Sequence, residues 1–278
     1  MVPMSRKMGL SKRIHDGYVL TEDEKITAAG EYTKEKGEQI IRDYGNNLFV
    51  MGSEKQGDFT LDDIVCNETC LLPGFVKAHG HDHESPIIGI AKDCALTDWL
   101  DGAVNLFTGF LDETREDLVA QFGKSPNLVT YLKARVDDTY YGITSSMVHH
   151  CNFNKYSVAD IVEANRQAHT KMIVAVGSQD RNYDDRILDI PHTLAVDRLN
   201  DYQKKFEGVP RTWIIPGPDQ FFSNGPELLK ALKRWSQDNG TLIHIHSSEA
   251  VSYTHLRAHE TVVRISYAVF CLKKGGGG

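Results

Sequence analysis

Two pairs of histidines, each spaced i, i+2, are the residues best placed to do chemistry. His79 and His81 end an apolar run that begins at Leu71, and His244 and His246 lie in the run TLIHIHSSE. Side chains two residues apart in a strand point to the same side, so the members of a pair can reach one metal ion. Imidazole suits zinc and other borderline divalent ions. The spacing therefore predicts a metal site at the ends of two strands.

Glu249 follows the second histidine pair by three residues. This places Glu249 at the end of the fifth apolar segment, in the loop where barrel enzymes keep their catalytic groups. A single histidine on a strand is more often a satisfied core residue. Two pairs, one of them followed by a carboxylate, favour a functional site over that interpretation.

The histidine pairs belong to two of five apolar segments that alternate with amphipathic stretches. These segments cover residues 71–81, 143–151, 171–178, 211–217 and 241–249. Strands that are apolar on both faces and separated by helices predict a parallel sheet covered by helices. The carboxyl ends of such strands are where barrel enzymes carry their catalytic groups. The chain has neither GxGxxG nor GxxxxGK[ST], the phosphate-binding signatures of open nucleotide-binding sheets. Periodicity alone leaves an open sheet and a barrel as alternatives.

The amphipathic stretches carry helix signals. Ser125, followed by proline, and Ser157, in a pattern similar to a capping box, predict two helix starts. Leu228, Leu232 and Trp235 fall on one face of a later helix, which predicts their burial against the sheet. Residues 1–70 have a different sequence pattern, with short apolar runs between glycine, asparagine and acidic residues. They predict a small β-rich portion that also holds one short helix.

At the histidine pairs the chain resembles the amidohydrolase superfamily, closest to its deaminase and chlorohydrolase branch, which acts on nucleobases, adenosine derivatives and triazines. LLPGFVKAHGHDHESPIIGIAKDCALTDWL is similar to that branch's PGFxxxHxH stretch and the helix after it, and GTLIHIHSSEA is similar to its HxHxxE stretch. The resemblance runs from about Cys70 to Ala250. It implies an α/β fold, a partial (β/α)8 TIM-like barrel with about five strands present, beside a small N-terminal β-rich sandwich portion.

The resemblance also implies roles for individual residues. By position, His79, His81 and His246 would be metal ligands and Glu249 the proton shuttle, while His244 would lie beside the ligands or in the core. One divalent metal ion is implied, Zn first, with Fe or Mn as alternatives. The fourth-strand segment RTWIIPGPDQ has no lysine, which favours the one-metal deaminases over ring-opening cyclic amidohydrolases.

The expected reaction is hydrolysis of a C–N bond other than a peptide, most simply deamination of an aminated heterocycle (a cyclic amidine) by zinc-activated water. A chloride on the same carbon would leave by the same route. A non-catalytic α/β fragment or binding module is the alternative from a different class. Substrate contacts are expected from loops at the same strand ends, with a polar loop or the core as the alternative role. These candidates are His83, Glu84, His149, His150 and Gln179.

Residues 251–278 do not continue the pattern of the preceding strands. VSYTHLRAHET and ISYAVFCL resemble translated sequencing-adapter sequence, and the chain closes on GGGG. We therefore expect residues 71–250 to be a truncated barrel and residues 251–278 a non-native tail, so that the chain alone is inactive. The sixth-strand histidine and eighth-strand aspartate of the family would fall beyond residue 250. The i, i+4 pair His255 and His259 is accordingly not interpreted as a zinc site.

The composition of the chain limits the classes of partner that it can bind. The net charge is −7, and no apolar run approaches the roughly 18 residues of a membrane span. A basic face for nucleic acid is not expected. Five irregularly spaced cysteines in a chain of 278 residues are typical of reduced thiols. We expect a cytoplasmic protein with a small-molecule substrate and no nucleic-acid or membrane partner; a homo-oligomeric parent is left open.

Overall fold

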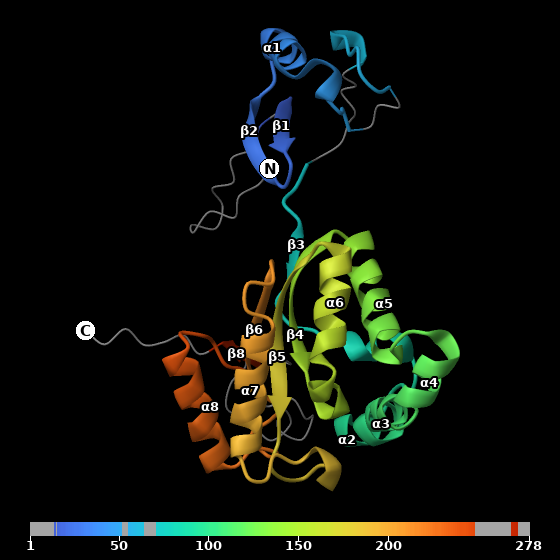
Figure 1. Ribbon diagram of the computed structural model, residues 1–278, viewed down its shortest axis with the longest axis vertical. Helices are drawn as coiled ribbons and strands as arrows, with labels where there is room; N and C mark the ends of the chain where they lie inside the picture. The colour runs from blue at the N-terminus through green and yellow to red at the C-terminus, as the bar shows by residue number, and fades with distance from the viewer. Residues whose placement is uncertain (1–13, 15, 52–54, 64–70, 248–267, 272–278) are drawn as a thin grey trace, which may run out of the picture. The chain divides into compact units, whose positions relative to one another are not determined.

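The protein is described here by a computed structural model that covers residues 14, 16–51, 55–63, 71–247 and 268–271 (Figure 1). The chain divides into two compact units, Met1–Pro73 and Gly74–Gly278. Among the described helices, none combines the length and the apolar character that a membrane crossing demands.

The first unit contains a β-hairpin and one helix. Strands β1 (Gly17–Glu22) and β2 (Lys25–Glu31) pair antiparallel, and α1 (Lys34–Tyr44) follows. Thr33 begins α1 by accepting a hydrogen bond from the backbone N of Lys36 through its hydroxyl at 3.2 Å, which satisfies one free donor of the first turn. Two 3-10 helices complete the described part, Gly45–Asn47 and Leu61–Asp63.

The second unit is built on a parallel sheet of four strands in the order β3-β4-β5-β6. These strands are Phe75–Lys77, Ile143–His150, Lys171–Ser178 and Thr212–Pro218. The expected α/β fold with a parallel sheet, consistent with a partial TIM-like barrel, is confirmed.

The fifth expected strand, β7 (His244–Ser247), lies beside β6 but shares only one isolated bridge with that part of the chain. The bridge joins His246 to Gln220, and the backbone N of His246 donates to the carbonyl of Asp219 at 3.2 Å. Strand β7 also pairs antiparallel with β8 (Ala268–Cys271). The histidine at 246 is thereby brought to the carboxyl end of β6.

Helices connect the strands. The short segments before and between them include the 3-10 helices Asp82–Ile87, Asn152–Tyr156 and Asp185–Ile187, and the π-helix Leu100–Val104. The α-helices of this unit are α2 (Leu96–Trp99), α3 (Asn105–Glu113), α4 (Arg115–Phe122), α5 (Pro126–Tyr140), α6 (Val158–Ala168), α7 (Thr193–Lys205) and α8 (Pro226–Asp238).

One apolar core joins helices α5–α8 to one face of the sheet (Figure 1). Val148, Val174 and Ile214 stand side by side on neighbouring strands and all face this core. The predicted face of α8, Leu228, Leu232 and Trp235, is buried in the same cluster. Residues that alternate with these on the strands face the other side of the sheet, and that side leads to the histidine cluster.

Candidate metal centre

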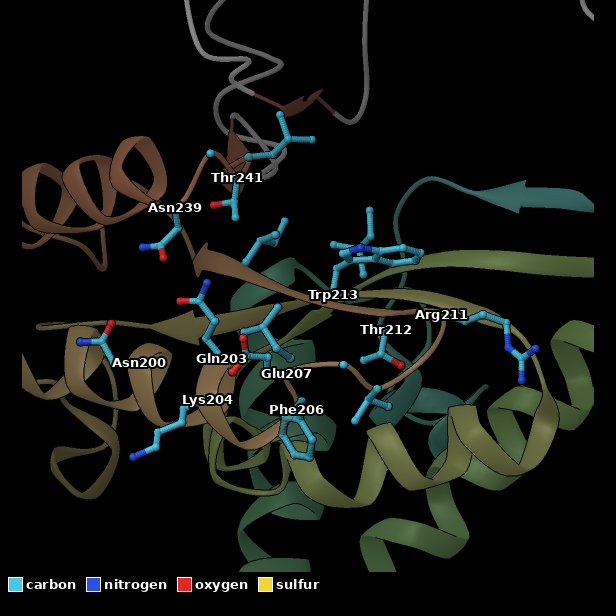
Figure 2. A pocket seen from close by; sticks show the side chains of 17 residues that line it. Asn200, Gln203, Lys204, Phe206, Glu207, Arg211, Thr212, Trp213, Asn239 and Thr241 are labelled. Atoms are coloured by element: carbon cyan, nitrogen blue, oxygen red, sulfur yellow. The ribbon is translucent and has the colours of Figure 1, made fainter.

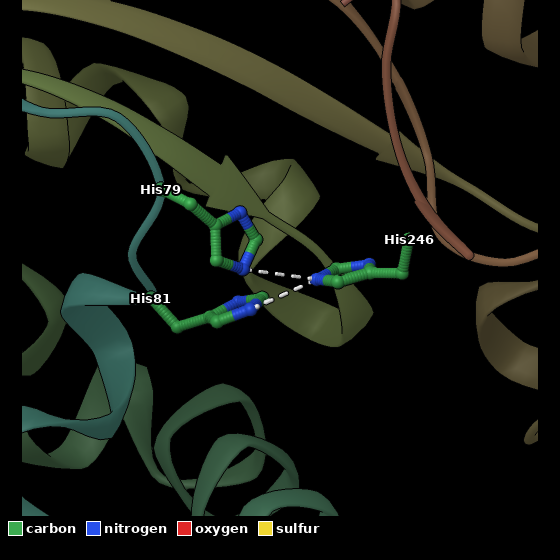
Figure 3. Close-up of side chains that lie close together, drawn as sticks. All are labelled: His79, His81 and His246. Atoms are coloured by element: carbon green, nitrogen blue, oxygen red, sulfur yellow. Dashed lines mark hydrogen bonds between the residues drawn. The ribbon is translucent and has the colours of Figure 1, made fainter. Parts of the chain in front are cut away.

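Three imidazoles from two distant segments meet at the carboxyl ends of the strands (Figure 3). His79 and His81 follow β3, and His246 comes from β7. The Nε2 atom of His246 lies 3.1 Å from Nε2 of His81 and 3.3 Å from Nε2 of His79. These residues are at least 165 positions apart in the sequence, and the approach of β7 to β6 brings them together. The structure thus brings together all three of the histidines that sequence analysis assigned to a metal.

Backbone carbonyls fix the tautomers of two of these rings. Nδ1 of His246 lies 2.8 Å from the carbonyl of Asp219, and Nδ1 of His81 lies 3.2 Å from the carbonyl of His149. A carbonyl only accepts, so each Nδ1 carries the proton and donates. In a neutral imidazole the other nitrogen, Nε2, is then a bare lone pair. Histidines that bind metals are held in this way, with the second ring nitrogen donating to a carbonyl or carboxylate.

Burial favours the neutral form of the His79 and His81 rings. It lowers the pKa of His79 to about 4 and the pKa of His81 well below the usual value, with neighbouring histidines adding to the effect. Neutral imidazole is the form that coordinates metals. Nε2 of the His81 ring, whose Nδ1 donates to a carbonyl, lies 3.1 Å from Nε2 of His246.

The spacing of the three nitrogens fits one tetrahedral ion. Ligand distances of about 2.0–2.1 Å at a tetrahedral zinc place the nitrogens about 3.3–3.4 Å apart. The observed separations of 3.1 and 3.3 Å are close to that span. A cation between the three Nε2 atoms would form three favourable bonds. The donor set and its geometry therefore fit a divalent metal ion.

His244 supports the site from the side. Its Nε2 lies 3.1 Å from Nδ1 of His79, and the residue is fully buried. Burial, together with the adjacent His79 and His246, lowers the pKa of His244 to about 3. This position beside a ligand is one of the two that the sequence left open for His244.

Sequence analysis missed Asp219, which follows β6 directly. Its carboxylate accepts a short hydrogen bond from the hydroxyl of Tyr183, and Oδ1 lies 3.5 Å from Nε2 of His149 and 3.7 Å from Nδ1 of His246. The available signal was its place at the carboxyl end of a parallel strand, in the same RTWIIPGPDQ segment that was searched only for a lysine.

Two further groups of side chains lie near metal-binding distance, and each shares a ring with the first. His149, Asp219 and His246 form one, and His81, His83 and Cys151 form the other. In both groups the shared ring approaches the carboxylate or the thiol through Nδ1, which already donates to a carbonyl. In the second group Sγ of Cys151 is 4.0 Å from the nitrogens of both histidines. The three Nε2 atoms of His79, His81 and His246 remain the best-formed site.

The predicted substrate residues are distributed over both faces of the sheet. His149 pairs with Ala175, on the face opposite the apolar core, and its ring centroid is 4.3 Å from that of His246. His150 faces the helices instead, 5.2 Å from the ring of Tyr131. Both rings are fully buried, and none of their nitrogens has a hydrogen-bond partner in the described part of the chain.

The other three lie in the loops. Glu84 Oε1 is 3.6 Å from Nε2 of the fully buried His83, beside the metal group. Gln179 is also fully buried, and its Oε1 accepts from Lys155 at 3.5 Å. Contact of these residues with a substrate stays a prediction. Glu249 lies outside the described residues.

A separate cavity of about 820 Å³ lies at the other end of the strands (Figure 2). Its walls come from the amino-terminal ends of β5 and β6, the end of α7 and the segment before β7. It contains none of the predicted site residues. Its lining includes Phe206, Glu207, Thr212, Trp213, Asn239 and Thr241.

Comparison with known proteins adds relatives at the level of sequence. No protein-family model matches the chain. A 5-methylthioadenosine/S-adenosylhomocysteine deaminase of Bacillus cereus is 23% identical over 245 residues, which cover 85% of this chain and 46% of the relative. The chain therefore spans about half the length of the curated relatives it matches.

Solved structures share the fold. A guanine deaminase of C. acetobutylicum with bound guanine aligns over 92% of this chain and 54% of its own, with a TM-score of 0.63 and 17% identity. An atrazine chlorohydrolase of Arthrobacter aurescens, complexed with zinc, aligns over 68% and 43%, with a TM-score of 0.53 and 20% identity. These proteins are deaminases and chlorohydrolases, hydrolytic enzymes of the amidohydrolase superfamily. The resemblance inferred from the histidine motifs is confirmed.

Proposed function

We propose that a protein with this chain, whose sequence and fold resemble those of amidohydrolase-type deaminases and chlorohydrolases, is a metal-dependent hydrolase that deaminates an aminated heterocycle. The observation that carries the proposal is the approach of Nε2 of His81 and Nε2 of His246 to 3.1 Å, with His79 beside them. A divalent cation between the nitrogens would satisfy all three imidazoles at once.

In this proposal different residues of the chain have different roles. His79, His81 and His246 hold one divalent ion, with zinc as the first choice because neutral imidazoles suit it. When bound, that ion supplies Lewis acidity and lowers the pKa of water from about 15.7 towards about 7. The carbonyls of His149 and Asp219 keep the ligand nitrogens unprotonated.

Proton transfer is assigned to Glu249 by its position in the HxHxxE motif. In this role its carboxylate takes one proton from the attacking water and delivers it to a ring nitrogen, and it then moves the proton of the newly added hydroxyl to the leaving amine. Attack at the ring carbon breaks the exocyclic C–N bond and releases ammonia. The relatives named above act on adenosine derivatives, guanine and atrazine, which supports a planar nitrogen heterocycle as the substrate class.

The test combines metal binding with product release. The purified chain should bind one Zn²⁺. Ammonia and chloride should be followed with a completed parent enzyme that contains this chain, across aminated and chlorinated purines, pyrimidines and triazines. In that enzyme Glu249→Gln should retain the ion and lower turnover by about 10²-fold or more, since it keeps the size of the side chain and removes its proton transfer. Loss of the ion together with turnover would make Glu249 a ligand instead. Chloride without ammonia would identify a chlorohydrolase.

A wild-type chain that binds no divalent ion would contradict the metal site itself. A metal-loaded parent enzyme that releases neither product would favour the non-catalytic fragment or binding module over an active hydrolase.

A further inference from the structure

A buried network of four charges lies directly behind the metal-binding loop. Arg135 and Asp138 come from α5, Lys77 is the last residue of β3, and Asp82 is the first residue of the 3-10 helix that follows His81. The side chains of Arg135 and Asp82 are completely inaccessible to solvent. Asp138 is 10% exposed and Lys77 is 23% exposed at the side chain, so the network is closed off from bulk water on most sides.

Each carboxylate contacts both cations. Nη2 of Arg135 forms a short hydrogen bond with Oδ2 of Asp82 and contacts Oδ2 of Asp138 at 2.7 Å. Nζ of Lys77 donates to Oδ1 of Asp82 at 3.1 Å and to Oδ1 of Asp138 at 3.0 Å. The two positive and two negative charges balance. Buried charges are tolerated only with such pairing, because removing one partner leaves another stranded in a medium of low polarity.

The network ties four elements together. Besides its carboxylates, Arg135 holds Ser146 of β4, donating from Nη1 to the hydroxyl at 3.1 Å. Lys77 reaches Asp82 by folding back over Gly80, where a Cβ atom would lie only 2.9 Å from Cε of the lysine. Glycine at this position leaves room for the lysine stem. The ends of β3 and β4, the loop between His79 and His83, and α5 are therefore fixed to one another.

Asp82 is the member of the network that is joined to the metal centre through the backbone. It follows His81 directly, and its side chain is held towards α5 while the ring of His81 reaches His246. On its other side the loop is held by β4: the backbone N of His149 donates to the carbonyl of Gly80 at 2.8 Å, and Nδ1 of His81 donates back to the carbonyl of His149 at 3.2 Å. The backbone at His81 is thus held both by β4 and by the Asp82 carboxylate.

We propose that Asp82, clamped between Arg135 and Lys77, is a positioning residue that sets the orientation of His81 in the metal centre. The proposal rests on the proposed metal-binding function. It predicts that the clamp determines metal affinity by holding the His81 ring against the carbonyl of His149, with Nε2 aimed at the ion. Asp138 belongs to the same network but lies on α5, away from the loop, so its loss should weaken the fold without turning His81.

The first experiment needs no metal. Imidazole nitrogen NMR spectra of the metal-free full chain report which nitrogen of His81 is protonated. In the wild type the Nδ1–H form should dominate. Asp82→Asn should shift His81 towards a mixture of tautomers, whereas Asp138→Asn should leave its signals in place. An unchanged His81 in Asp82→Asn would overturn the proposal, and so would equal changes in both variants.

The second experiment measures Co²⁺ affinity and the visible spectrum of the bound ion. Asp82→Asn should weaken binding by about 10- to 100-fold, the usual effect of losing a contact that orients a ligand, and should alter the spectrum. Asp138→Asn is the matched control, because it removes one carboxylate from the same network. It should lower the melting temperature but change the affinity by less than about threefold, well below the range for ligand-orienting contacts. Equal losses of affinity would show general destabilisation and overturn the proposal.

Two further variants keep the test decisive if Asp82→Asn does not fold. Lys77→Met removes the more exposed cation and leaves the bonds of Arg135 to both carboxylates in place, so it should fold and still shift the His81 tautomer. Arg135→Lys should retain part of the affinity that Arg135→Met loses. If wild type binds no Co²⁺ the proposed function fails, while the metal-free spectra still decide whether Asp82 positions His81.

Discussion

The middle of the parallel sheet and its carboxyl-terminal edge are built from the same strands but in opposite ways. In the middle, Val148, Val174 and Ile214 lie in one row against the helices and are buried in a continuous apolar core. At the carboxyl edge, His149, Gln179 and Asp219 are buried almost as deeply. The edge lies only a residue or a few further along each strand.

The two regions differ in whether the burial of their side chains is energetically favourable. Apolar side chains in the middle gain from leaving water. At the edge, ring nitrogens of His83, His149, His150 and His244 are buried without hydrogen-bond partners among the described residues. Such groups reduce stability unless a water, an ion or a substrate completes them. The middle therefore stabilises the fold, and the edge holds polar groups ready for a ligand.

The largest effect is expected from a substitution that destabilises the middle of the sheet and leaves the carboxyl edge intact. Leu232 of α8 is almost completely buried in the core. Leu232→Ala removes its buried methyl groups and leaves a cavity, which should lower the free energy of unfolding by about 2–5 kcal/mol. Urea denaturation measures the loss, and Co²⁺ affinity of the remaining folded protein should stay at the wild-type value. A parallel loss of affinity would show that the two regions are not independent.

The next effect breaks the edge and spares the middle. His246→Asn keeps an N–H group near the carbonyl of Asp219 and removes the Nε2 lone pair. Metal affinity should fall by more than about 100-fold, beyond the usual range for residues that only orient a ligand. The metal-free variant should unfold at nearly the wild-type urea concentration. Titration with Co²⁺ checks the first expectation; retained affinity would remove His246 from the ligand set.

Low pH should reduce the stability of the metal-free protein by protonating a histidine at the carboxyl edge. Burial lowers the pKa of the fully buried His83 to about 4, against about 6.5 for the unfolded chain. The unfolded state then binds the proton first, so the stability is present above about pH 6.5 and is lost as pH falls towards about 4. One such histidine accounts for about 1–2 kcal/mol between pH 7 and 5. Urea unfolding at both pH values should show this loss, and His83→Asn should reduce it.

The sequence predicted the features that depend on local pattern. The strand segments and the buried face of α8 follow from apolar periodicity. His79 and His81 both approach His246, but β3 ends at Lys77, so the strand alternation used to predict their common side does not apply to them. The tertiary partners did not follow from any local signal. The Arg135–Asp82 contact joins residues 53 positions apart, and the role of Asp219 depends on how closely β7 approaches β6.

Helix capping shows the same limit at one residue. Ser157 begins α6 as its pattern predicts, but its side chain makes no capping hydrogen bond. Its hydroxyl instead donates to the carbonyl of Asn154 at 3.0 Å and lies 2.9 Å from the hydroxyl of Tyr131. The buried Tyr131 supplies a tertiary partner that outweighs the local bond. Sequence pattern identified the helix start but not the partner of its serine.

The smallest expected effect decides which atoms at the edge hold the ion. Asp219 contacts His246 in two ways, through its carbonyl at 2.8 Å and through its carboxylate at 3.7 Å. Asp219→Asn leaves the carbonyl in place, so the His246 tautomer should persist and Co²⁺ affinity should change by less than about threefold, below the usual range for outer contacts. If the ion were held by His149, Asp219 and His246 instead, the same substitution would remove a charged ligand. Affinity would then fall as far as it does in His246→Asn. Isothermal titration of the two variants side by side separates these outcomes, because of the two groups that contain His246 only the one formed by the three Nε2 atoms makes the carboxylate of Asp219 dispensable.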